Sequence, residues 1–497
     1  MNNTENRLSH LLSGLDLIEI EGPSELIISS LTFHHQEVEA GGLFFAIPGA
    51  QVDGHEFICS AISAGAIAIV CEKIPQSHPG TTFIRVVDSR RALGFIASKY
   101  YNSPSSRLCL VGITGTNGKT TSVTWLYHVS QFLGHKAGLF STVRNEIDGK
   151  VIPATHTTPD ALQLNRLMLQ MVESGCTHCF MEVSSHAIHQ NRIAGLCFAG
   201  GVFTNLTHDH LDYHGTMESY FHVKKRFFDD LPKDAFALTN KDDPRGLDII
   251  ADCQADIKKT YSLSTDADYR AELIELSMKG MQLRINSHNL TTQLLGQFNV
   301  YNLTEVWGVC DLLGYQSPRV ATFIKDLKPV EGRYQWLLSE DGIFAVVDFA
   351  HTPDALRNVL TTTREIRPSG RIVTVFGCGG NKDREKRPHM GKLAAELSDY
   401  VIVTSDNPRT ENPIDIIADI CRGITIQDFK AKVTVISERN LAIQFARAFV
   451  KPGDSIVLAG RGHEKYQEIL DERIPFYDMD ALRSVLLDPV IGEGRRN

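Results

Sequence analysis

A glycine-rich segment at residues 111–121 has the residue types that bind a nucleotide triphosphate. It reads Val-Gly-Ile-Thr-Gly-Thr-Asn-Gly-Lys-Thr-Thr. An apolar run at 108–111 precedes it, and residues 122–133 carry apolar side chains at helical spacing, so the segment joins a strand to a helix N-terminus. Backbone N–H groups and the helix dipole bind an anion in such a turn. Lys119 adds a positive charge, and the Thr120 hydroxyl can ligate magnesium.

The match to the general phosphate-binding loop is imperfect. That pattern has four residues between its first glycine and the Gly-Lys pair, and Gly112 lies one residue too far back. The alternative is an ordinary strand-to-helix turn with a surface lysine, but the flanking strand and helix favour nucleotide binding. The residues expected to surround the phosphates are Gly115, Thr116, Asn117, Gly118, Lys119, Thr120 and Thr121.

Glu182 and His210 are candidate metal ligands, and both follow apolar, strand-like runs. Phosphoryl transfer needs magnesium to neutralise developing charge, and Thr120, Glu182 and His210 could surround the ion. A solvated loop histidine is the usual alternative for a lone histidine. The dense run Thr-His-Asp-His-Leu-Asp-Tyr-His at 207–214 favours a functional role instead.

Unusual polar residues follow apolar strands in the same way at six places along the chain. In open α/β sheets, ligands bind at the carboxyl ends of the strands. The placement therefore predicts two domains that face each other across a cleft. The six segments are Glu182–His186, Thr207–His210, Asp348–His351, Gly377–Gly380, Asp406–Arg409 and Gly460–Glu464.

Three blocks organise the chain, with predicted limits at 1–105, 106–330 and 331–497. The first has short strands between Gly and Pro turns and ends in a segment of linker composition, Asn102–Ser106. The other two alternate strands and helices, which indicates an α/β fold with largely parallel sheets. Expected strands are 43–47, 66–71, 83–87, 179–183, 201–206, 235–239, 344–347, 372–376, 400–403 and 455–458, and expected helices include 122–133, 393–397 and 441–450.

Length and composition limit the class of protein. A chain of 497 residues has room for about three domains. Its net charge of −9 provides no basic field for nucleic acid or an anionic membrane, and no apolar run approaches membrane-spanning length. The start, Met1–Glu5, lacks the features of a signal peptide. We therefore expect a cytoplasmic protein without nucleic-acid partners or membrane insertion.

The ten cysteines are scattered. Several lie in apolar, strand-like runs, which suggests reduced core thiols: Cys71, Cys109, Cys179 and Cys197. Cys176 and Cys179 form a Cys-x-x-Cys pair, but a zinc site needs two more ligands and none follows nearby. We interpret this pair as structural.

Together, the polar segments resemble those of the Mur ligases, ATP-dependent enzymes that form amide bonds in peptidoglycan precursor synthesis. The motifs occur in the family's order and span essentially the full chain. They are Thr114–Thr121, Glu182–Ala187, Asp209–His214, Gly332-Arg333 and Asp348–Pro353. The resemblance implies a UDP-binding N-terminal domain, a central P-loop-type ATPase domain with a parallel sheet, and a Rossmann-like C-terminal domain.

The resemblance also implies the reaction. ATP phosphorylates the terminal carboxylate of UDP-N-acetylmuramoyl-L-alanyl-D-glutamate, and the amine of meso-diaminopimelate attacks the resulting acyl phosphate. A tetrahedral intermediate then releases phosphate. Lys119 and Mg²⁺ would stabilise the transferring phosphoryl group. We expect a monomer whose domains close to assemble the site.

A carbamylated lysine is a further implication of the resemblance. In the family it lies ten residues beyond the last histidine of the Asp-His-Leu-Asp-Tyr-His motif, and His214 plus ten is Lys224. A free ammonium would repel magnesium, whereas a carbamate is an oxygen ligand. Without the resemblance, Lys224 would be interpreted as a solvated helix lysine. Lys225 is the alternative position.

The resemblance assigns the remaining substrate contacts. ATP would also contact Asn299, Asn302, Arg333, Asp348 and His351. A helix cap is nearly as good an interpretation of the two asparagines. The UDP-sugar dipeptide would contact Thr157, Thr158, Ser184, Gln190 and Arg192. Relatives often have Asp-Ser-Arg where this chain has His34-His35-Gln36, so the serine and arginine expected at the uridine end are missing.

The choice of amino acid is predicted from the sequence Asp-Asn-Pro-Arg at 406–409. Arg409 can pair bidentately with the second carboxylate of meso-diaminopimelate, which lysine lacks, although a surface salt bridge is the alternative role. Lys382 stands where relatives usually have arginine, and Arg384 is a candidate to compensate. The amino-acid contacts implied by the resemblance are Lys382, Asp406, Asn407, Pro408, Arg409, Gly460 and Glu464.

Other functions stay open at this point. A sister Mur ligase that adds L-lysine or another residue, or a folylpolyglutamate synthetase, would share the phosphate loop. The Asp-Asn-Pro-Arg sequence discriminates against both. A P-loop ATPase or nucleotide-dependent switch belongs to a different class, and its ATP turnover would not require the two other substrates.

Overall fold

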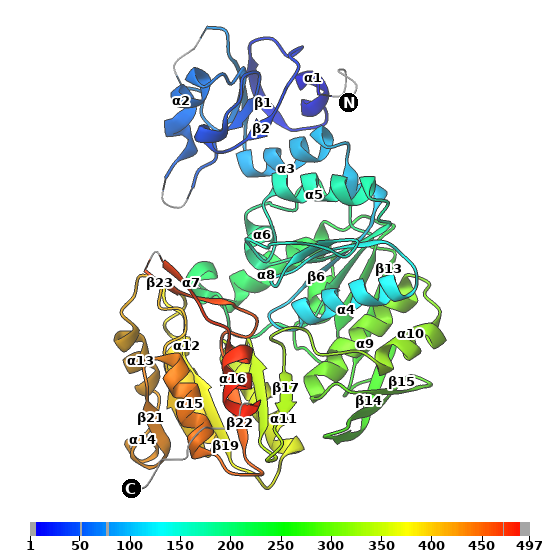
Figure 1. Ribbon diagram of the computed structural model, residues 1–497. Coiled ribbons are helices and arrows are strands. Elements are labelled where there is room, and N and C mark those ends of the chain that lie inside the picture. The colour runs from blue at the N-terminus through cyan, green and yellow to red at the C-terminus, as the bar shows by residue number, and fades with distance from the viewer. Residues whose placement is uncertain (1–5, 50–51, 76–78, 471, 488–497) are drawn as a thin grey trace.

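The computed structural model describes residues 6–49, 52–75, 79–470 and 472–487 (Figure 1). Three β-sheets follow one another along the chain, each with its own buried core. Residues 1–5, on which the prediction about a signal peptide rests, lie outside these ranges. In the part of the chain that is described, no helix is both long and apolar enough to cross a lipid bilayer.

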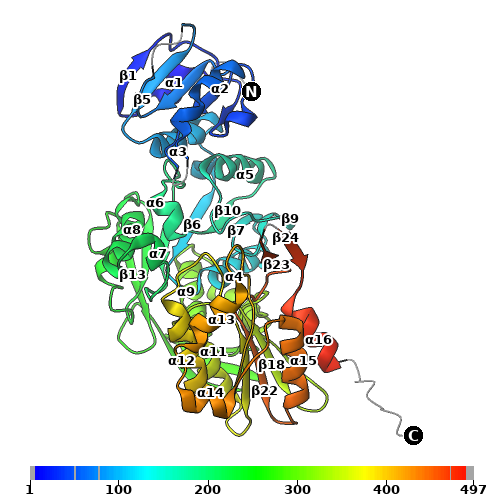
Figure 2. The same cartoon turned by 90° about the vertical axis from the view of Figure 1, so that its left-hand side faces the viewer.

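The first sheet has the strand order β1-β5-β4-β3-β2, and only β1 is antiparallel to its neighbour. Its strands are β1 Leu17–Glu21, β2 Leu31–Thr32, β3 Leu43–Phe45, β4 Ala68–Cys71 and β5 Thr82–Val86. Helices α1 Leu8–Leu12, α2 Ile58–Ser63 and α3 Ser89–Tyr100 accompany it. Helix α3 packs on α5 of the next block, which joins the two parts (Figure 2).

The second sheet has eleven strands, and its centre, β7-β10-β6-β11-β12-β13-β14, is parallel. The outer strands β8, β9, β15 and β16 pair antiparallel. The strands are β6 Cys109–Thr114, β7 Ala137–Phe140, β8 Asn145–Ile147, β9 Lys150–Ile152, β10 His178–Glu182, β11 Gly200–Phe203, β12 Phe236–Asn240, β13 Ile257–Ser262, β14 Tyr269–Ser277, β15 Gly280–Ile285 and β16 His288–Thr292. The helices are α4 Lys119–Phe132, α5 Ala161–Glu173, α6 Ser185–His189, α7 Leu211–His214, α8 Met217–Asp229, α9 Gln297–Leu312 and α10 Ser317–Lys325.

The third sheet has the order β17-β18-β22-β19-β20-β21 and is parallel except for β17. Its strands are β17 Gln335–Leu338, β18 Phe344–Asp348, β19 Ile372–Phe376, β20 Tyr400–Val403, β21 Val433–Val435 and β22 Ser455–Ala459. The helices are α11 Pro353–Ile366, α12 Lys386–Leu397, α13 Pro413–Cys421, α14 Ile426–Lys432, α15 Arg439–Phe449 and α16 Asp478–Leu487. A separate antiparallel hairpin is formed by β23 Tyr466–Ile469 and β24 Glu472–Pro475.

The α/β class and the expected strands are confirmed, with ends that differ by a few residues. The prediction for Cys197 is wrong: it is exposed, and the nearby strand begins only at Gly200. The segment expected to be a linker instead enters a short 3₁₀ helix, Pro104–Arg107, whose Pro104 and Ser105 are buried. The domain limits at 105/106 and 330/331 remain a proposal, and both fall between sheets.

Candidate active site

The phosphate loop lies between the end of β6 and the start of α4. Gly115 and Gly118 have φ of 148° and 94°, a region that favours glycine. A Cβ on Gly115 would overlap the Thr204 hydroxyl, and one on Gly118 would lie 2.7 Å from the Asn302 Oδ1. Thr204 Oγ1 donates to the Asn117 carbonyl at 2.6 Å. The loop is therefore held closely against the segment that follows β11, and only glycine fits at these two positions.

Lys119 folds back over this loop. Its Nζ donates to the carbonyl oxygens of Gly115 and Thr116, at 2.8 Å each. Burial lowers the pKa of the ammonium, with the opposing charges of Glu182 and Asp209 nearby. The lysine occupies the position from which it can reach an anion bound by the loop.

A cavity of about 690 Å³ separates the second and third sheets, and most predicted site residues line it. All six segments predicted at strand ends contribute to the lining, so the predicted cleft between two domains is present. The predicted residues in the lining are Gly115, Thr116, Asn117, Gly118, Lys119, Thr120, Thr121, Thr157, Glu182, Ser184, His210, Lys224, Asn302, Arg333, Asp348, His351, Lys382, Asp406, Asn407, Arg409, Gly460 and Glu464. Those outside it are Thr158, Gln190, Arg192, Asn299 and Pro408.

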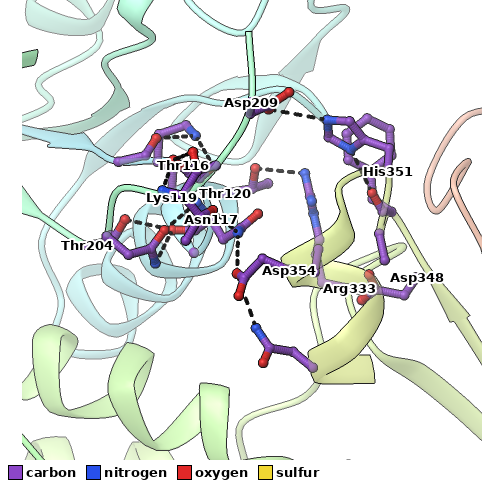
Figure 3. Close-up of a pocket in the computed structure, with 18 of the residues that line it drawn as sticks. Thr116, Asn117, Lys119, Thr120, Thr204, Asp209, Arg333, Asp348, His351 and Asp354 are labelled. Carbon is purple, nitrogen blue, oxygen red and sulfur yellow. Dashed lines mark hydrogen bonds and ion pairs between the residues drawn. The ribbon is translucent and has the colours of Figure 1, made fainter. Parts of the chain in front are cut away.

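Contacts across the cavity join the central and C-terminal blocks (Figure 3). Asn117 Nδ2 donates to Asp354 Oδ2 at 3.0 Å, and Arg333 Nη2 donates to Thr120 Oγ1 at 2.9 Å. His351 lies 3.8 Å from the Asp209 carboxylate. The loop and the third block thus enclose the same space.

Asp209 is the buried negative centre of this region. Burial opposes its charge, but His210, His351 and Lys386 together hold the pKa of its carboxyl well below the usual range. Burial lowers the pKa of His210 itself to about 3, so its imidazole is neutral near pH 7. A neutral imidazole is the form that can ligate a metal.

Lys224 is buried on α8, so its interpretation as a solvated lysine is wrong. Its Nζ lies 3.0 Å from the Gly115 carbonyl, and burial and the charge of Lys119 lower its pKa well below the ordinary value. Lys225 instead forms ion pairs with Asp229 and Asp252 at 2.6 and 2.7 Å. Of the two lysines, Lys224 is the one in the cavity.

The donors present fit Mg²⁺ bound together with phosphate. Glu182 is buried, and it accepts from Thr142 N–H at 2.7 Å, while Thr120 and His210 line the same space. Among the described residues, no three His, Cys, Asp or Glu side chains form a complete metal site. Mg²⁺ usually retains waters and takes few protein ligands beside substrate phosphates. A set of few protein donors is therefore suitable for this ion.

The helix-cap interpretation of the two asparagines is wrong. Gly296 is the N-cap of α9, and Asn299 and Asn302 lie inside the helix. Asn299 Nδ2 donates to the Leu295 carbonyl, and its Oδ1 accepts from Asn302 Nδ2 at 3.2 Å. Asn302 faces the cavity, whereas Asn299 orients it from behind.

The predicted dipeptide contacts form a network that begins at the cavity wall. Thr158 is buried, and its hydroxyl donates to the Glu182 carbonyl at 2.7 Å. Arg192 donates to the Thr158 carbonyl and to Gln190 Oε1, both at 2.8 Å. Ser184 connects this network to the lining through a 3.2 Å hydrogen bond with Thr158. In the N-terminal block, His35 stacks on Phe57, with ring centroids 4.1 Å apart.

The Asp-Asn-Pro-Arg segment follows β20 and brings opposite charges together. Asn407 Nδ2 donates to Glu464 Oε2 at 2.8 Å. Burial and the neighbouring Asp406 carboxylate raise the pKa of Glu464 to about 7. Burial and the charge of Arg409 lower the pKa of Lys382. The site thus presents two carboxyl groups, those of Asp406 and Glu464, and two basic side chains, Lys382 and Arg409, to a ligand.

Two predictions about the amino-acid contacts, those for Arg384 and Pro408, need correction. Arg384 does not compensate for Lys382, because it lies near Glu411 and Asp419, at 3.6 and 3.5 Å, outside the cavity lining. Pro408 is likewise not in the lining, and its carbonyl packs so close to Gly380 that a Cβ there would overlap it.

Family models and a curated relative agree on the family to which this chain is similar. The Mur ligase middle domain matches residues 113–310, the Mur ligase glutamate ligase domain matches 332–462, and the Mur ligase family catalytic domain matches 28–101. The UDP-N-acetylmuramoyl-L-alanyl-D-glutamate–2,6-diaminopimelate ligase of Cytophaga hutchinsonii is 47% identical over 97% of this chain and 99% of its own length. The chain belongs to the Mur ligase family.

Further relatives of this Mur ligase carry the same name. The Bacteroides thetaiotaomicron enzyme is 48% identical over 96% of this chain and 99% of its own. A solved structure of such a diaminopimelate ligase is 32% identical, with a TM-score of 0.67, and covers 94% of this chain and 97% of its own. MurF of Thermotoga maritima, solved with ADP, is 18% identical over 88% of this chain and 95% of its own, with a TM-score of 0.60, and shares the fold.

Sequence reasoning missed several residues of this Mur ligase site. Asp354 and Lys386 line the cavity from the C-terminal block, and Asp209 lines it from the central block. Asp209 lies inside the motif that contains His210, and Asp354 lies just beyond the motif at 348–353, so proximity was the available signal. Their partners come from other blocks, which a linear sequence does not reveal.

Proposed function

We propose that the chain is an ATP-dependent ligase that joins meso-diaminopimelate to UDP-N-acetylmuramoyl-L-alanyl-D-glutamate. The supporting observation is that one cavity is lined both by the phosphate loop and by Asp406, Asn407 and Arg409. Relatives of this name match essentially the whole chain. The phosphoryl donor and the incoming amine can therefore meet at one substrate carboxylate.

The central block would bind ATP and the acceptor carboxylate. The loop N–H groups and Lys119 hold the phosphates, Asn302 adds a contact from the same block, and Arg333 and His351 complete the nucleotide side from the C-terminal block. Thr120, Glu182 and His210 would hold Mg²⁺, which neutralises charge on the transferring phosphoryl group when bound. The UDP-sugar dipeptide would approach through Ser184 and the network of Thr158, Gln190 and Arg192.

Lys224 is proposed to be carbamylated. Its lowered pKa favours a neutral amine, whose nitrogen can add to the carbon of CO₂ and release one proton. The product is an anionic carbamate. Beside the Lys119 ammonium, the carbamate would put an anion in place of a neutral amine, and it would add an oxygen ligand for magnesium.

The C-terminal block would hold the amino acid. Arg409 and Lys382 would bind the distal carboxylate of meso-diaminopimelate, and Asp406, Asn407 and Glu464 would bind its distal ammonium. Gly460 has φ of 112°, and a Cβ there would overlap the Asp406 carboxylate, so glycine leaves room for that acid. L-Lysine has no distal carboxylate and would present only an ammonium to these two cations, which favours meso-diaminopimelate.

The reaction then follows from this placement. The substrate carboxylate attacks the γ-phosphorus of ATP and ADP leaves, which gives an acyl phosphate. The amine attacks the acyl carbon, and phosphate departs as the amide forms. Contacts such as Asn117–Asp354 close the cavity and exclude water that would hydrolyse the acyl phosphate. We propose that the enzyme is a monomer, since one chain provides all of these groups, and that it acts in the cytoplasm.

A phosphate-release assay tests this function. We expect ATP turnover only when UDP-N-acetylmuramoyl-L-alanyl-D-glutamate and meso-diaminopimelate are both present with Mg²⁺. Omission of either substrate should reduce phosphate release to background. Turnover that is independent of both substrates would show an ATPase or a nucleotide switch and would contradict the proposal.

A further inference from the structure

Behind Arg409 lies an acidic side chain, Glu468, to which the proposed function gives no role. Glu468 lies on β23 of the C-terminal hairpin, and its Oε2 accepts from Arg409 Nε at 3.1 Å. Both side chains are about one quarter exposed, at 28%. Arg409 is part of the cavity lining and Glu468 is not. The carboxylate therefore contacts the guanidinium from outside the ligand space.

A second contact restricts the same guanidinium. Arg409 Nη1 donates to the Gly380 carbonyl at 2.8 Å, and a Cβ on Gly379 would lie 3.0 Å from Nη1. A guanidinium has five N–H donors, and these two bonds use one on Nε and one on Nη1. Nη2 makes no recorded hydrogen bond with the described residues. The Nη1 and Nη2 edge is thus the part left for a carboxylate.

The backbone of β23 also holds the Asp-Asn-Pro-Arg segment. Arg409 has φ of 51°, in the left-handed region that few side chains adopt. Its N–H donates to the Glu468 carbonyl at 3.0 Å, and its carbonyl accepts from Leu470 N–H at 2.7 Å. The N–H of Glu468 donates to Asn407 Oδ1 at 2.9 Å. The hairpin therefore fixes both the backbone and the side chain of Arg409.

We propose that Glu468 is a positioning residue that orients the Arg409 guanidinium for the distal carboxylate of the amino-acid substrate. A long, flexible side chain loses less entropy on binding when it is ordered beforehand. The other Glu468 oxygen lies 3.3 Å from Arg473 Nη2, so the carboxylate is itself held from two sides. This inference deepens the proposed function and rests on it.

A competing role is that Glu468 imitates the substrate carboxylate and blocks Arg409. Its absence from the cavity lining and its use of Nε argue against this role. The two roles also predict opposite effects. Removal of a positioning residue raises the KM for the amino acid, whereas removal of a blocking residue lowers it.

Steady-state kinetics of Glu468→Ala and Glu468→Gln test the inference. For Glu468→Ala we expect the KM for meso-diaminopimelate to rise about tenfold, which corresponds to ~1.4 kcal/mol. The kcat and the KM for ATP should stay within about twofold, since neither site is touched. Glu468→Gln keeps an oxygen that accepts from Nε and should restore most of the affinity. Glu472→Ala, which removes an exposed carboxylate on β24, is the matched control and should leave all constants unchanged.

L-Lysine gives a readout that a merely structural role would not produce. Since lysine has no distal carboxylate, Glu468→Ala should leave its kcat/KM unchanged, and the preference for diaminopimelate should fall about tenfold. An unchanged or lower KM for diaminopimelate, or an equal loss with both amino acids, overturns the inference. The proposed function fails separately, through the absence of diaminopimelate-dependent turnover in the unsubstituted chain, and this inference fails with it.

Discussion

Glu464 and Asp348 illustrate at the residue scale how burial sets protonation in this cavity. Burial raises the pKa of Asp348 to about 6, although Arg333 opposes that change, and burial with Asp406 raises the pKa of Glu464 to about 7. Both groups therefore titrate near physiological pH, unlike ordinary carboxylates. For Glu464, this makes recognition of a substrate ammonium sensitive to pH.

The pH dependence of the amino-acid KM tests this assignment. The raised pKa means that Glu464 is protonated below about pH 7, and a neutral carboxyl binds an ammonium weakly. We expect the KM for meso-diaminopimelate to rise as the pH falls, approaching about tenfold per pH unit. Glu464→Gln should raise this KM at pH 8 and flatten its pH profile. The same profile in both proteins would assign the effect to another group.

Residue types could be predicted from the sequence where a motif carries them, but side-chain partners could not. The phosphate loop, Glu182, His210 and Lys224 lie together in the cavity as expected. Arg384 carries the right charge at a nearby position, yet it pairs with Glu411 and Asp419, which belong to a later segment. Sequence proximity does not reveal which way a surface arginine points.

At the scale of elements, the turn between β6 and α4 depends on the positive φ of Gly118, and the same backbone conformation recurs at Gly134. Gly118 has φ of 94°, and Gly134, just beyond α4, has nearly the same value of 93°. A Cβ on Gly118 would lie 2.7 Å from Asn302 Oδ1, whereas a Cβ on Gly134 would meet nothing within 4 Å. A comparison of substitutions at these two positions therefore separates the effect of backbone strain from the effect of the close contact between the loop and α9.

Gly118→Ala and Gly134→Ala form a matched pair for this question. Each should destabilise the fold by roughly 1–2 kcal/mol, because alanine is strained in this backbone region. Only Gly118→Ala should raise the KM for ATP, by about tenfold or more, because it displaces the loop. Thermal unfolding and ATP kinetics measure the two effects. Equal ATP kinetics in both variants would show that the contact with Asn302 does not matter.

The periodicity of apolar residues and the polar residues at strand ends were sufficient to predict the strands around the site. The strands around the site agree with expectation because they are short, apolar and bounded by turn residues. The exception, Cys197, is exposed in a brief apolar stretch that precedes the strand, although the adjacent Phe198 is buried. The role of the β23–β24 hairpin could not be predicted, because its pairing with Arg409 is a long-range contact.

For the whole molecule, the position of the third block against the second assembles the site. The hydrogen bonds Arg333–Thr120 and Asn117–Asp354 cross the cavity, and so does the 3.8 Å approach of His351 to Asp209. The sequence predicts a cleft, since polar residues follow strands in both blocks. It does not predict these pairs, because the docking of two domains depends on surfaces that no local pattern describes.

The central claim is that this cavity selects meso-diaminopimelate through cations placed for its distal carboxylate. A competition assay tests it most directly: the chain receives ATP, Mg²⁺, the UDP-sugar dipeptide and equal concentrations of meso-diaminopimelate and L-lysine. Mass spectrometry then identifies the UDP-linked tripeptide. The account predicts that the diaminopimelate product exceeds the lysine product by about a hundredfold or more, because lysine lacks the carboxylate that these cations bind. Equal products, or a predominance of the lysine product, would contradict it.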